Sequence, residues 1–338
     1  MHPHLLELPI WVLTLILGGG LGATLVSSQG RLPFAILAGI AGAVLATLFA
    51  YLQPWGFDAL HGWHTIPIQS YGTMILIGFL FGVWMAARRA PLVGIEARHC
   101  VDIGVYGVLV GLTGARLLHI ISNWSQFTPF LDYGFEWARV AKMFKIWEAG
   151  LDFFGTFLTV IPGAFLYCKY FKLPAVAFLD LAAPGLIAGQ AFGRIGCFMY
   201  GCCFGKTADV PWAVHFPHQA PAFGQQVSAG LIENTAECSL GVHPTQLYAF
   251  LSAALTSGFL YAYWPRRRFD GMIISLLLIM AGATRFFEEL MRADEPPVFA
   301  ALPWFTAAHY FAAGVFVAGI VLLLYFRRRN QLAVGSGQ

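Results

Sequence analysis

Residues 193–206 read GRIGCFMYGCCFGK and place an arginine and three cysteines where the hydrophobicity of the chain predicts a membrane. The apolar run that leads into them, residues 174–200, is longer than the roughly 20 residues that a helix needs to cross a bilayer. Eight more stretches have this length and character: 5–26, 32–52, 71–90, 99–121, 150–171, 244–264, 270–292 and 304–326. We therefore expect an all-α polytopic membrane protein with about nine transmembrane helices.

The composition supports this expectation. Of the 338 residues, 58% are hydrophobic and only 11% are charged, and the mean hydropathy is +0.68. These values lie far outside the range of soluble domains. No long linker, low-complexity tract or internal repeat indicates a second domain, and nothing indicates a nucleic-acid partner.

The distribution of lysine and arginine predicts the orientation in the membrane. Twelve of these residues fall at one end of the predicted bundle: Arg31, Arg88, Arg89, Arg98, Lys169, Lys172, Arg266, Arg267, Arg268, Arg327, Arg328 and Arg329. Five fall at the opposite end: Arg139, Lys142, Lys145, Lys206 and Arg292. Because cytoplasmic ends carry the excess of positive charge, we expect the N-terminus outside and the C-terminus in the cytoplasm. The first segment is expected to stay as a membrane helix, since no basic region precedes it and no clear cleavage site follows it.

Arg194 is the first candidate site residue. A guanidinium in a membrane costs at least about 2.5 kcal/mol, so it is normally paired or faces a cavity. Glycines on both sides allow close backbone approach or a helix break that exposes amide donors. A cation beside free amides favours an anion such as phosphate. The alternative is that Arg194 only extends to the interface between membrane and water.

A second charged set lies in GATRFFEELMR, residues 282–292. Arg285, Glu288, Glu289 and Arg292 fall on one helical face, and intrahelical pairs such as Glu288 with Arg292 are sterically available. A face of this kind cannot point at lipid. It either belongs to a binding site or forms a structural network of ion pairs.

Weaker polar signals occur in other segments. His243 opens HPTQLY, residues 243–248, and can bind or accept a proton near neutral pH. Tyr71 stands at the start of the third segment, where it also fits an aromatic anchor at the membrane surface. Arg116 and His119 share one face of the fourth segment, and we expect both to contact the substrate. Most of these groups fall toward the predicted outer half, as a cavity for a lipid headgroup requires.

The six cysteines do not indicate a metal site by their spacing. Cys197, Cys202 and Cys203 lack the second ligand pair that zinc sites usually show, so we expect no metal. A disulfide from Cys238 to Cys202 or Cys203 is an alternative, because all three are predicted to lie outside.

Together these motifs resemble the bacterial prolipoprotein diacylglyceryl transferases. The matching pieces follow in order along the chain: SYGTMILIGFLFGVWMAARRA at 70–90, GARLL at 114–118, WEAGLDFFG at 147–155, GRIGCFMYGCCFG at 193–205, HPTQLY at 243–248, RRRFDG at 266–271 and RFFEELMR at 285–292. The resemblance implies a membrane enzyme of seven helices. Residues 1–65 then form an N-terminal extension with two further helices, 66–330 form the transferase core and 331–338 form a cytoplasmic tail.

The resemblance also implies an activity and its partners. Enzymes of this family sit in the cytoplasmic membrane and transfer the diacylglyceryl group of phosphatidylglycerol to the lipobox cysteine in the signal peptide of a preprolipoprotein. A thioether forms and glycerol 1-phosphate leaves, with no metal or organic cofactor. Arg194 matches the signature arginine for the lipid phosphate, and Arg285 matches a second essential arginine. Further matches are expected to contact substrate or support the site: Glu289, Arg292, Gly205 and Tyr71.

One position departs from the family pattern. Many members carry a histidine that is proposed to activate the thiol, and Phe154 occupies the corresponding place here. His243, His119 and Glu289 are candidate replacements, with His243 preferred; alternatively, the two arginines lower the pKa of the incoming thiol. Phe154 also leaves open a homologue that binds lipid or peptide without transfer, and an anionic-lipid transporter is a more distant alternative.

Overall fold

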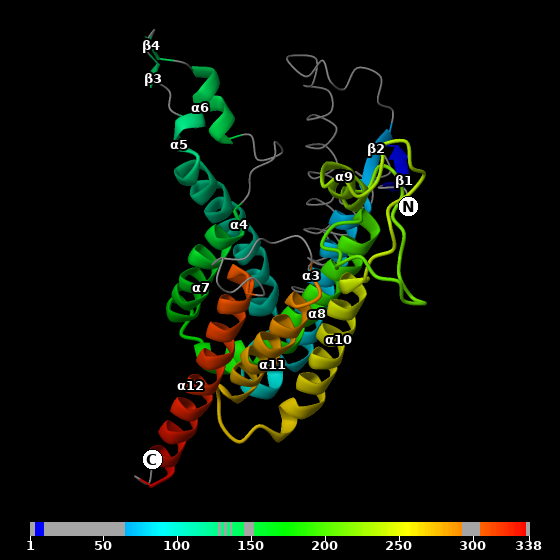
Figure 1. Ribbon diagram of the computed structural model, residues 1–338. Helices are drawn as coiled ribbons and strands as arrows, with labels where there is room; N and C mark the ends of the chain where they lie inside the picture. The colour runs from blue at the N-terminus through cyan, green and yellow to red at the C-terminus, as the bar shows by residue number, and fades with distance from the viewer. Residues whose placement is uncertain are drawn as a thin grey trace. The chain divides into compact units, whose positions relative to one another are not determined.

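The computed structural model describes residues 4–9, 65–127, 130–131, 134–135, 137–144, 152–292 and 305–335. Seven long helices make up most of this part (Figure 1): α3 (Ser70–Arg89), α4 (Ala97–Ser122), α7 (Phe153–Tyr170), α8 (Ala175–Tyr200), α10 (Thr245–Tyr263), α11 (Met272–Glu289) and α12 (Ala307–Gly335). Each coincides closely with one of the predicted apolar segments. The expectation of a predominantly helical protein is confirmed.

Four of these helices are long and apolar enough to cross a membrane: Ser70–Val93, Ala97–Ser122, Ala175–Tyr200 and Ala307–Leu332. The protein is therefore a multi-pass membrane protein. The predicted total of nine spans is not established. Most of the first two predicted spans lies in residues 10–64, outside the described residues. The helices α7, α10 and α11, with 18, 19 and 18 residues, are long enough but do not also meet the requirements for high hydropathy and few charged residues.

Short elements complete the described chain. The helical ones are η3 (Ala90–Val93), α5 (Trp124–Phe127), α6 (Trp137–Phe144), α9 (Pro221–Ser228) and η4 (Trp264–Arg266). Two antiparallel ribbons pair β1 (His4–Pro9) with β2 (Thr65–Gln69) and β3 (Phe130–Leu131) with β4 (Gly134–Phe135). The prediction that a helix begins at residue 5 is therefore wrong, because that residue lies in β1, whose backbone groups pair with β2.

The chain divides into two compact units. The first comprises Met1–Phe79, Ala188–Ala254 and Ala283–Ala313, and the second comprises Leu80–Ile187, Leu255–Gly282 and Gly314–Gln338. Five helices, α3, α8, α10, α11 and α12, contribute one end to each unit, whereas α4 and α7 lie wholly in the second.

In the second unit, α4 and α7 pack side by side (Figure 1). Their backbones approach most closely at Gly114 and Gly155, where a Cβ atom on either residue would collide with the partner's carbonyl group. Thr159 Oγ1 also donates a hydrogen bond to the carbonyl oxygen of Val110, at 3.1 Å. Small residues and side-chain hydrogen bonds of this kind associate helices in membranes, where the hydrophobic effect gives little help. Gly114 and Gly155, which belong to two of the matching motifs, thus meet at one helix crossing.

A buried carboxylate fixes the start of α11 in the same unit. Asp180, on α8, is fully buried and accepts hydrogen bonds from the backbone N–H groups of Gly271, at 2.8 Å, and Ile274, at 2.9 Å. These donors have no partner inside α11, since the first turn of a helix leaves its N–H groups unpaired. Asp180 therefore acts as a helix cap supplied by a different helix.

Candidate functional site

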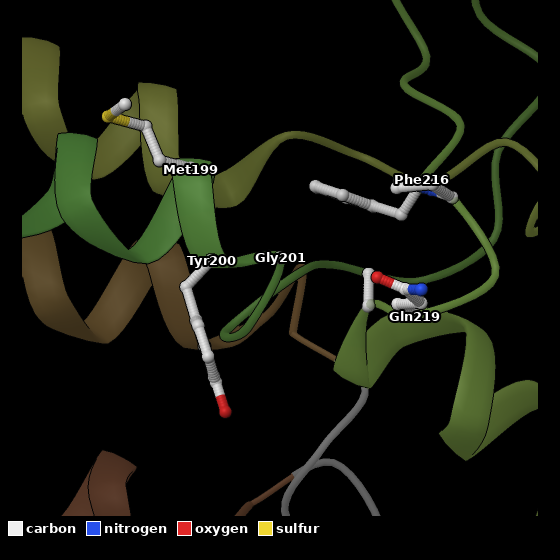
Figure 2. Close-up of a pocket in the computed structure, with 7 residues that line it drawn as sticks. Met199, Tyr200, Gly201, Phe216 and Gln219 are labelled. Carbon is white, nitrogen blue, oxygen red and sulfur yellow. The ribbon is translucent and has the colours of Figure 1, made fainter. Parts of the chain in front are cut away.

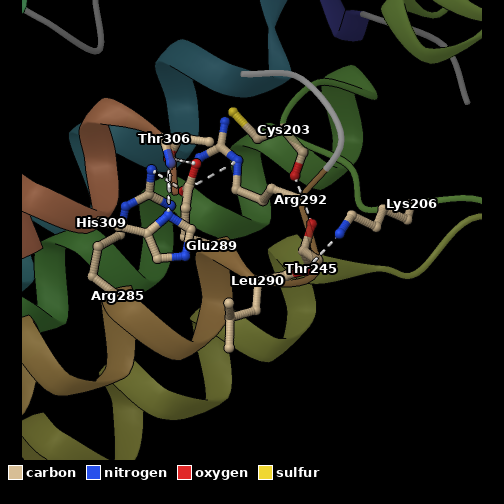
Figure 3. A network of polar contacts seen from close by, with 9 residues as sticks. All are labelled: Cys203, Lys206, Thr245, Arg285, Glu289, Leu290, Arg292, Thr306 and His309. Atoms are coloured by element: carbon tan, nitrogen blue, oxygen red, sulfur yellow. Dashed lines mark hydrogen bonds and ion pairs between the residues drawn. The ribbon is translucent and has the colours of Figure 1, made fainter. Parts of the chain in front are cut away.

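The charged residues of α11 meet at its end, in the first unit, around one buried carboxylate. Glu289 Oε2 lies 2.7 Å from Arg285 Nη2 and 3.9 Å from Arg292 Nε, and the Glu289 side chain is fully buried. Thr306 Oγ1 donates a hydrogen bond to Glu289 Oε1 at 3.0 Å, and its backbone N–H donates to His309 Nδ1 at 3.1 Å. Figure 3 shows these five side chains gathered together. One carboxylate thus lies between two guanidinium groups.

This arrangement distinguishes between the ion pairs that the helical spacing allows. Glu288 does not pair with Arg292; instead it accepts a hydrogen bond from Ser252 Oγ at 2.6 Å, so it is turned toward α10. Glu289 takes the intrahelical pairs, four residues after Arg285 and three before Arg292. Both acids satisfy the spacing rule, and packing decides between them because only Glu289 lies on the buried side of the helix.

The cluster retains unused capacity to bind an anion. Arg285 Nη1 is buried and has no hydrogen-bond partner among the described residues. The charge of Arg194, on α8, lies within electrostatic range of Arg285 and repels it. Arg194 is half-buried and forms no ion pair with any acid in the described parts of the chain. Two arginines therefore flank Glu289, with the charge of Arg194 close to Arg285, and a buried donor with no partner favours a negatively charged ligand.

Gly205 and Lys206, at the end of the signature segment 193–206, join this cluster to the start of α10. The N–H of Gly205 donates to the carbonyl oxygen of His243 at 2.9 Å, and the N–H of Lys206 donates to that of Met291 at 2.8 Å. Lys206 Nζ also donates to the carbonyl oxygen of Leu290 at 3.0 Å (Figure 3). A Cβ atom on Gly205 would lie 2.8 Å from His243 Cβ and from the carbonyl oxygen of Met291. Only glycine fits between these two helix ends.

Tyr71, at the start of α3, belongs to the same unit. Its ring packs against Gly196 of α8, where a Cβ atom would approach Tyr71 Cδ2 to 3.1 Å. The phenol lies within electrostatic range of Arg194 and of the three neighbouring cysteines. The structure thus places Tyr71, Arg194, Gly205, His243, Arg285, Glu289 and Arg292 in one unit.

His243 lies at the wall of a cavity of about 520 Å³ in the first unit. Its Nδ1 is 3.2 Å from the hydroxyl oxygen of Tyr248, and that oxygen accepts a hydrogen bond from Trp212 Nε1 at 2.7 Å. The cavity is lined by Trp212, His243, Thr245, Tyr248, Ser252, Thr284, Phe287, Glu288 and Met291. Apolar walls with a few polar groups are typical of sites for amphipathic ligands. A second cavity of about 40 Å³, beside Phe216 and Gln219 (Figure 2), is too small for a lipid or a peptide.

Arg116 and His119 lie in the second unit. Arg116 is buried and donates hydrogen bonds to the carbonyl oxygens of Lys142 and Met143, which satisfies the C-terminal end of α6. His119 contacts Asn123, with 3.3 Å between Nδ1 and Nδ2. Phe154 is exposed in the first turn of α7, where its N–H donates to Asp152 Oδ1 at 2.9 Å. These two hydrogen bonds of Arg116 attach the end of α6 to α4.

The three cysteines of the signature converge at the end of α8. Their Sγ atoms all lie within 4.8 Å of one another. Hydrogen bonds with the thiols of Cys197 and Cys202 lower the pKa of Cys203, which follows the membrane-spanning part of α8. Hydrogen bonds with the thiols of Cys197, which has the larger effect, and of Cys203 raise the pKa of Cys202. All six cysteines are free, so the disulfide considered for Cys238 does not form here.

Sequence reasoning missed several residues of the site. Thr306, just before α12, holds Glu289, His309 of α12 in turn contacts Thr306, and Tyr248 contacts His243. A histidine within an apolar segment is a signal that marks His309 as functional or paired. Ser252 carries no comparable signal, because an isolated serine is common in membrane helices.

These features define a multi-pass helical membrane protein with a buried arginine–glutamate cluster. Residues 58–325 match the sequence profile of the family described as prolipoprotein diacylglyceryl transferase. A phosphatidylglycerol–prolipoprotein diacylglyceryl transferase of Chromohalobacter salexigens is 30% identical over 271 residues, which cover 78% of this chain and 89% of that protein. A protein of the same name from Paenarthrobacter aurescens is 30% identical over 270 residues, which cover 79% and 81%. The chain belongs to the prolipoprotein diacylglyceryl transferase family, as its motifs predicted.

Proposed function

We propose that this protein transfers the diacylglyceryl group of phosphatidylglycerol to the thiol of a lipobox cysteine in a preprolipoprotein. The sulfur forms a thioether with a glyceryl carbon, and glycerol 1-phosphate leaves. Family membership supports a transferase over the transporter alternative. The observation that carries the proposal is the unused positive charge of two arginines. Arg194 has no acidic partner in the described chain and lies within electrostatic range of Arg285. Arg285 Nη1 is buried and has no hydrogen-bond partner among the described residues.

The lipid phosphate is assigned to Arg194 and Arg285. Negative charge grows on the departing phosphate as the carbon–oxygen bond breaks, and fixed donors at that point stabilise the transition state most in a dry site. Glu289 holds Arg285 and Arg292 in place and limits the repulsion among the three cations. Gly205 and Tyr71 shape the walls beside them. Arg116 and His119, expected from the sequence to contact substrate, receive no such role because their described contacts are structural.

His243 is assigned as the acceptor of the thiol proton. It lines the larger cavity, and its contact with Tyr248 orients the ring. Glu289 is less suited, because a carboxylate that holds two guanidinium groups is a weak base. The apolar walls of the same cavity fit an acyl chain or the apolar part of a signal peptide.

The proposed location is the bacterial cytoplasmic membrane, with the N-terminus outside and the C-terminus in the cytoplasm. The excess of lysine and arginine at one end of the bundle supports this orientation. The chemistry requires the site to open where a secreted preprolipoprotein arrives, and residues 201–243, which include the end of the signature, fall on the outer side in this topology.

A transfer assay tests the proposal directly. The purified full chain is incubated with phosphatidylglycerol and a lipobox peptide, and the peptide mass and released glycerol phosphate are measured. We expect a diacylglyceryl mass gain that requires the thiol. Arg194→Ala should lose it, whereas Arg98→Ala, which removes an exposed arginine paired with Glu96, should keep it. Lipid and peptide binding without a mass gain would identify a homologue that has lost its chemistry.

A further inference from the structure

The three thiols at the end of α8 have the spacing of a metal site. The Sγ atoms of Cys197, Cys202 and Cys203 lie within 4.8 Å of one another. Thiolates that bind one Zn²⁺ at about 2.3 Å in a tetrahedron are about 3.8 Å apart. Small side-chain rotations therefore suffice to place all three sulfurs around one ion.

The backbone holds the three cysteines together through an unusual turn. Gly201, at φ 81°, ends α8, and the N–H groups of Gly201 and Cys202 both donate to the carbonyl oxygen of Cys197, at 2.9 and 3.2 Å. The chain then folds back over Cys197. Cys203 has φ 58°, in the left-handed region that residues with a side chain rarely adopt.

Two buried side chains of α10 hold this turn in place. Thr245 Oγ1 donates to the carbonyl oxygen of Cys203 at 2.8 Å, and Gln246 Nε2 donates to that of Cys202 at 2.7 Å. Supports of this kind around metal ligands fix their orientation. Sequence spacing gave no sign of this site, because Cys202 and Cys203 reach Cys197 only through the left-handed turn.

The surrounding charges also fit a metal thiolate cluster. Three thiolates and one divalent cation carry a net charge of about −1. Arg292 and Arg194 both lie within electrostatic range of Cys203 and oppose that charge. In the described residues, no further cysteine, histidine or acid completes the group of three. Three protein ligands leave the fourth tetrahedral position open, as in catalytic rather than structural zinc sites.

We propose that Cys197, Cys202 and Cys203 bind one thiophilic divalent ion of the Zn²⁺ class, with its fourth position open to an incoming thiol. The ion's part in catalysis rests on the proposed function. A lipobox thiol at the fourth position is bound as thiolate, since coordination to zinc deprotonates a thiol. Its proton passes to His243, its sulfur bonds to the glyceryl carbon, and the electrons of the broken carbon–oxygen bond leave with glycerol 1-phosphate. A bound thiolate compensates for the family's histidine that Phe154 replaces.

Metal content provides the first test. The full chain is purified under reducing conditions without chelator, and its metal content is measured by elemental mass spectrometry. A second sample is reconstituted with Co²⁺, and its absorption spectrum is recorded. We expect about one metal ion per chain and the near-ultraviolet thiolate charge-transfer band of tetrahedral Co²⁺. Cys197→Ser and Cys203→Ser should lose both signals, while Cys238→Ser, which changes an exposed cysteine outside the group, should keep them. Wild-type protein that takes up neither ion, or whose mass shows a disulfide within the group, would overturn the proposal.

Activity then separates the metal site from the proposed function. Removing the ion with phenanthroline should lower transfer by roughly 100-fold or more, the scale expected when thiol activation is lost, and added Zn²⁺ should restore it. Arg194→Ala should keep the ion and lose transfer. Full transfer by metal-free protein would overturn the metal's role and leave the function intact, whereas metal binding without any transfer would contradict the function alone.

Discussion

The carboxylate of Glu289 lies 2.7 Å from the guanidinium of Arg285, one helical turn earlier on α11, and no part of the Glu289 side chain is exposed. A buried acid between basic groups is costly to form but more costly to disrupt, because removing one partner leaves an uncompensated charge. Arg292 and Arg194 add to the positive charge nearby. Glu289 thus compensates the charges of Arg285 and Arg292, which lie beside a third cation, Arg194.

Glu289→Gln should therefore destabilise the protein and reduce transfer. The amide keeps an acceptor for Thr306 but no longer balances Arg285, and we expect a loss of about 3 kcal/mol in the free energy of unfolding. Thermal unfolding in detergent measures this change. Glu288→Gln is the matched control, since Glu288 is only partly buried and its contact with Ser252 survives in the amide. Equal unfolding temperatures for the two variants would contradict the central role of Glu289.

Gly205→Ala should impair the site through a steric clash. The new methyl group would lie 2.8 Å from His243 Cβ and from the carbonyl oxygen of Met291, so the ends of α10 and α11 must move apart. We expect a loss of roughly 1–3 kcal/mol in unfolding free energy, together with weaker lipid binding. Gly224→Ala, where the methyl group meets nothing within 4 Å, serves as control and should be neutral or slightly stabilising. Unfolding midpoints and phosphatidylglycerol binding, measured side by side, decide between these outcomes.

Sequence patterns anticipated the helices better than the contacts between them. A stretch such as 174–200 must be a helix if it crosses a membrane, because only a helix satisfies its own backbone there, and α8 follows that stretch closely. The pattern also selected Arg194, Arg285 and Glu289, since charges in apolar segments are rare. It could not choose between Glu288 and Glu289 as the partner of the arginines, because both fit the helical spacing and only packing separates them.

Two other features lay beyond sequence reasoning for physical reasons. Arg116 donates to carbonyl oxygens of α6, a short helix that is distant in the chain and whose approach no spacing rule encodes. The cysteine cluster depends on φ 81° at Gly201 and φ 58° at Cys203, a turn that spacing alone does not specify.

Asp180→Ala should destabilise the protein without touching the candidate site. It leaves the N–H groups of Gly271 and Ile274 buried without an acceptor, which costs about 2–3 kcal/mol. Asp180→Asn should cost less, because its amide oxygen can still accept from one of them. Asp270→Ala is the control: its pair with Arg267 spans 3.7 Å and the carboxylate side chain is 56% exposed, so its effect should be near zero. The unfolding midpoint should be lowest for Asp180→Ala, higher for Asp180→Asn and close to that of the wild type for Asp270→Ala. A neutral Asp180→Ala would show that the cap is dispensable.

The predicted orientation can be tested with a native thiol. Cys238 is exposed in the segment between α8 and α10, which the charge distribution places outside the cell. A membrane-impermeant maleimide should therefore label Cys238 in spheroplasts, and Cys238→Ser should lose that label, which corrects for slower reaction at the partly buried Cys202 and Cys203. A cysteine introduced near the C-terminus, which is predicted to be cytoplasmic, should be labelled only after the membrane is opened. The variant for this test is Gln338→Cys in the Cys238→Ser background. The reverse pattern would invert the topology and place the arginine cluster on the cytoplasmic side, where a secreted preprolipoprotein could not reach it.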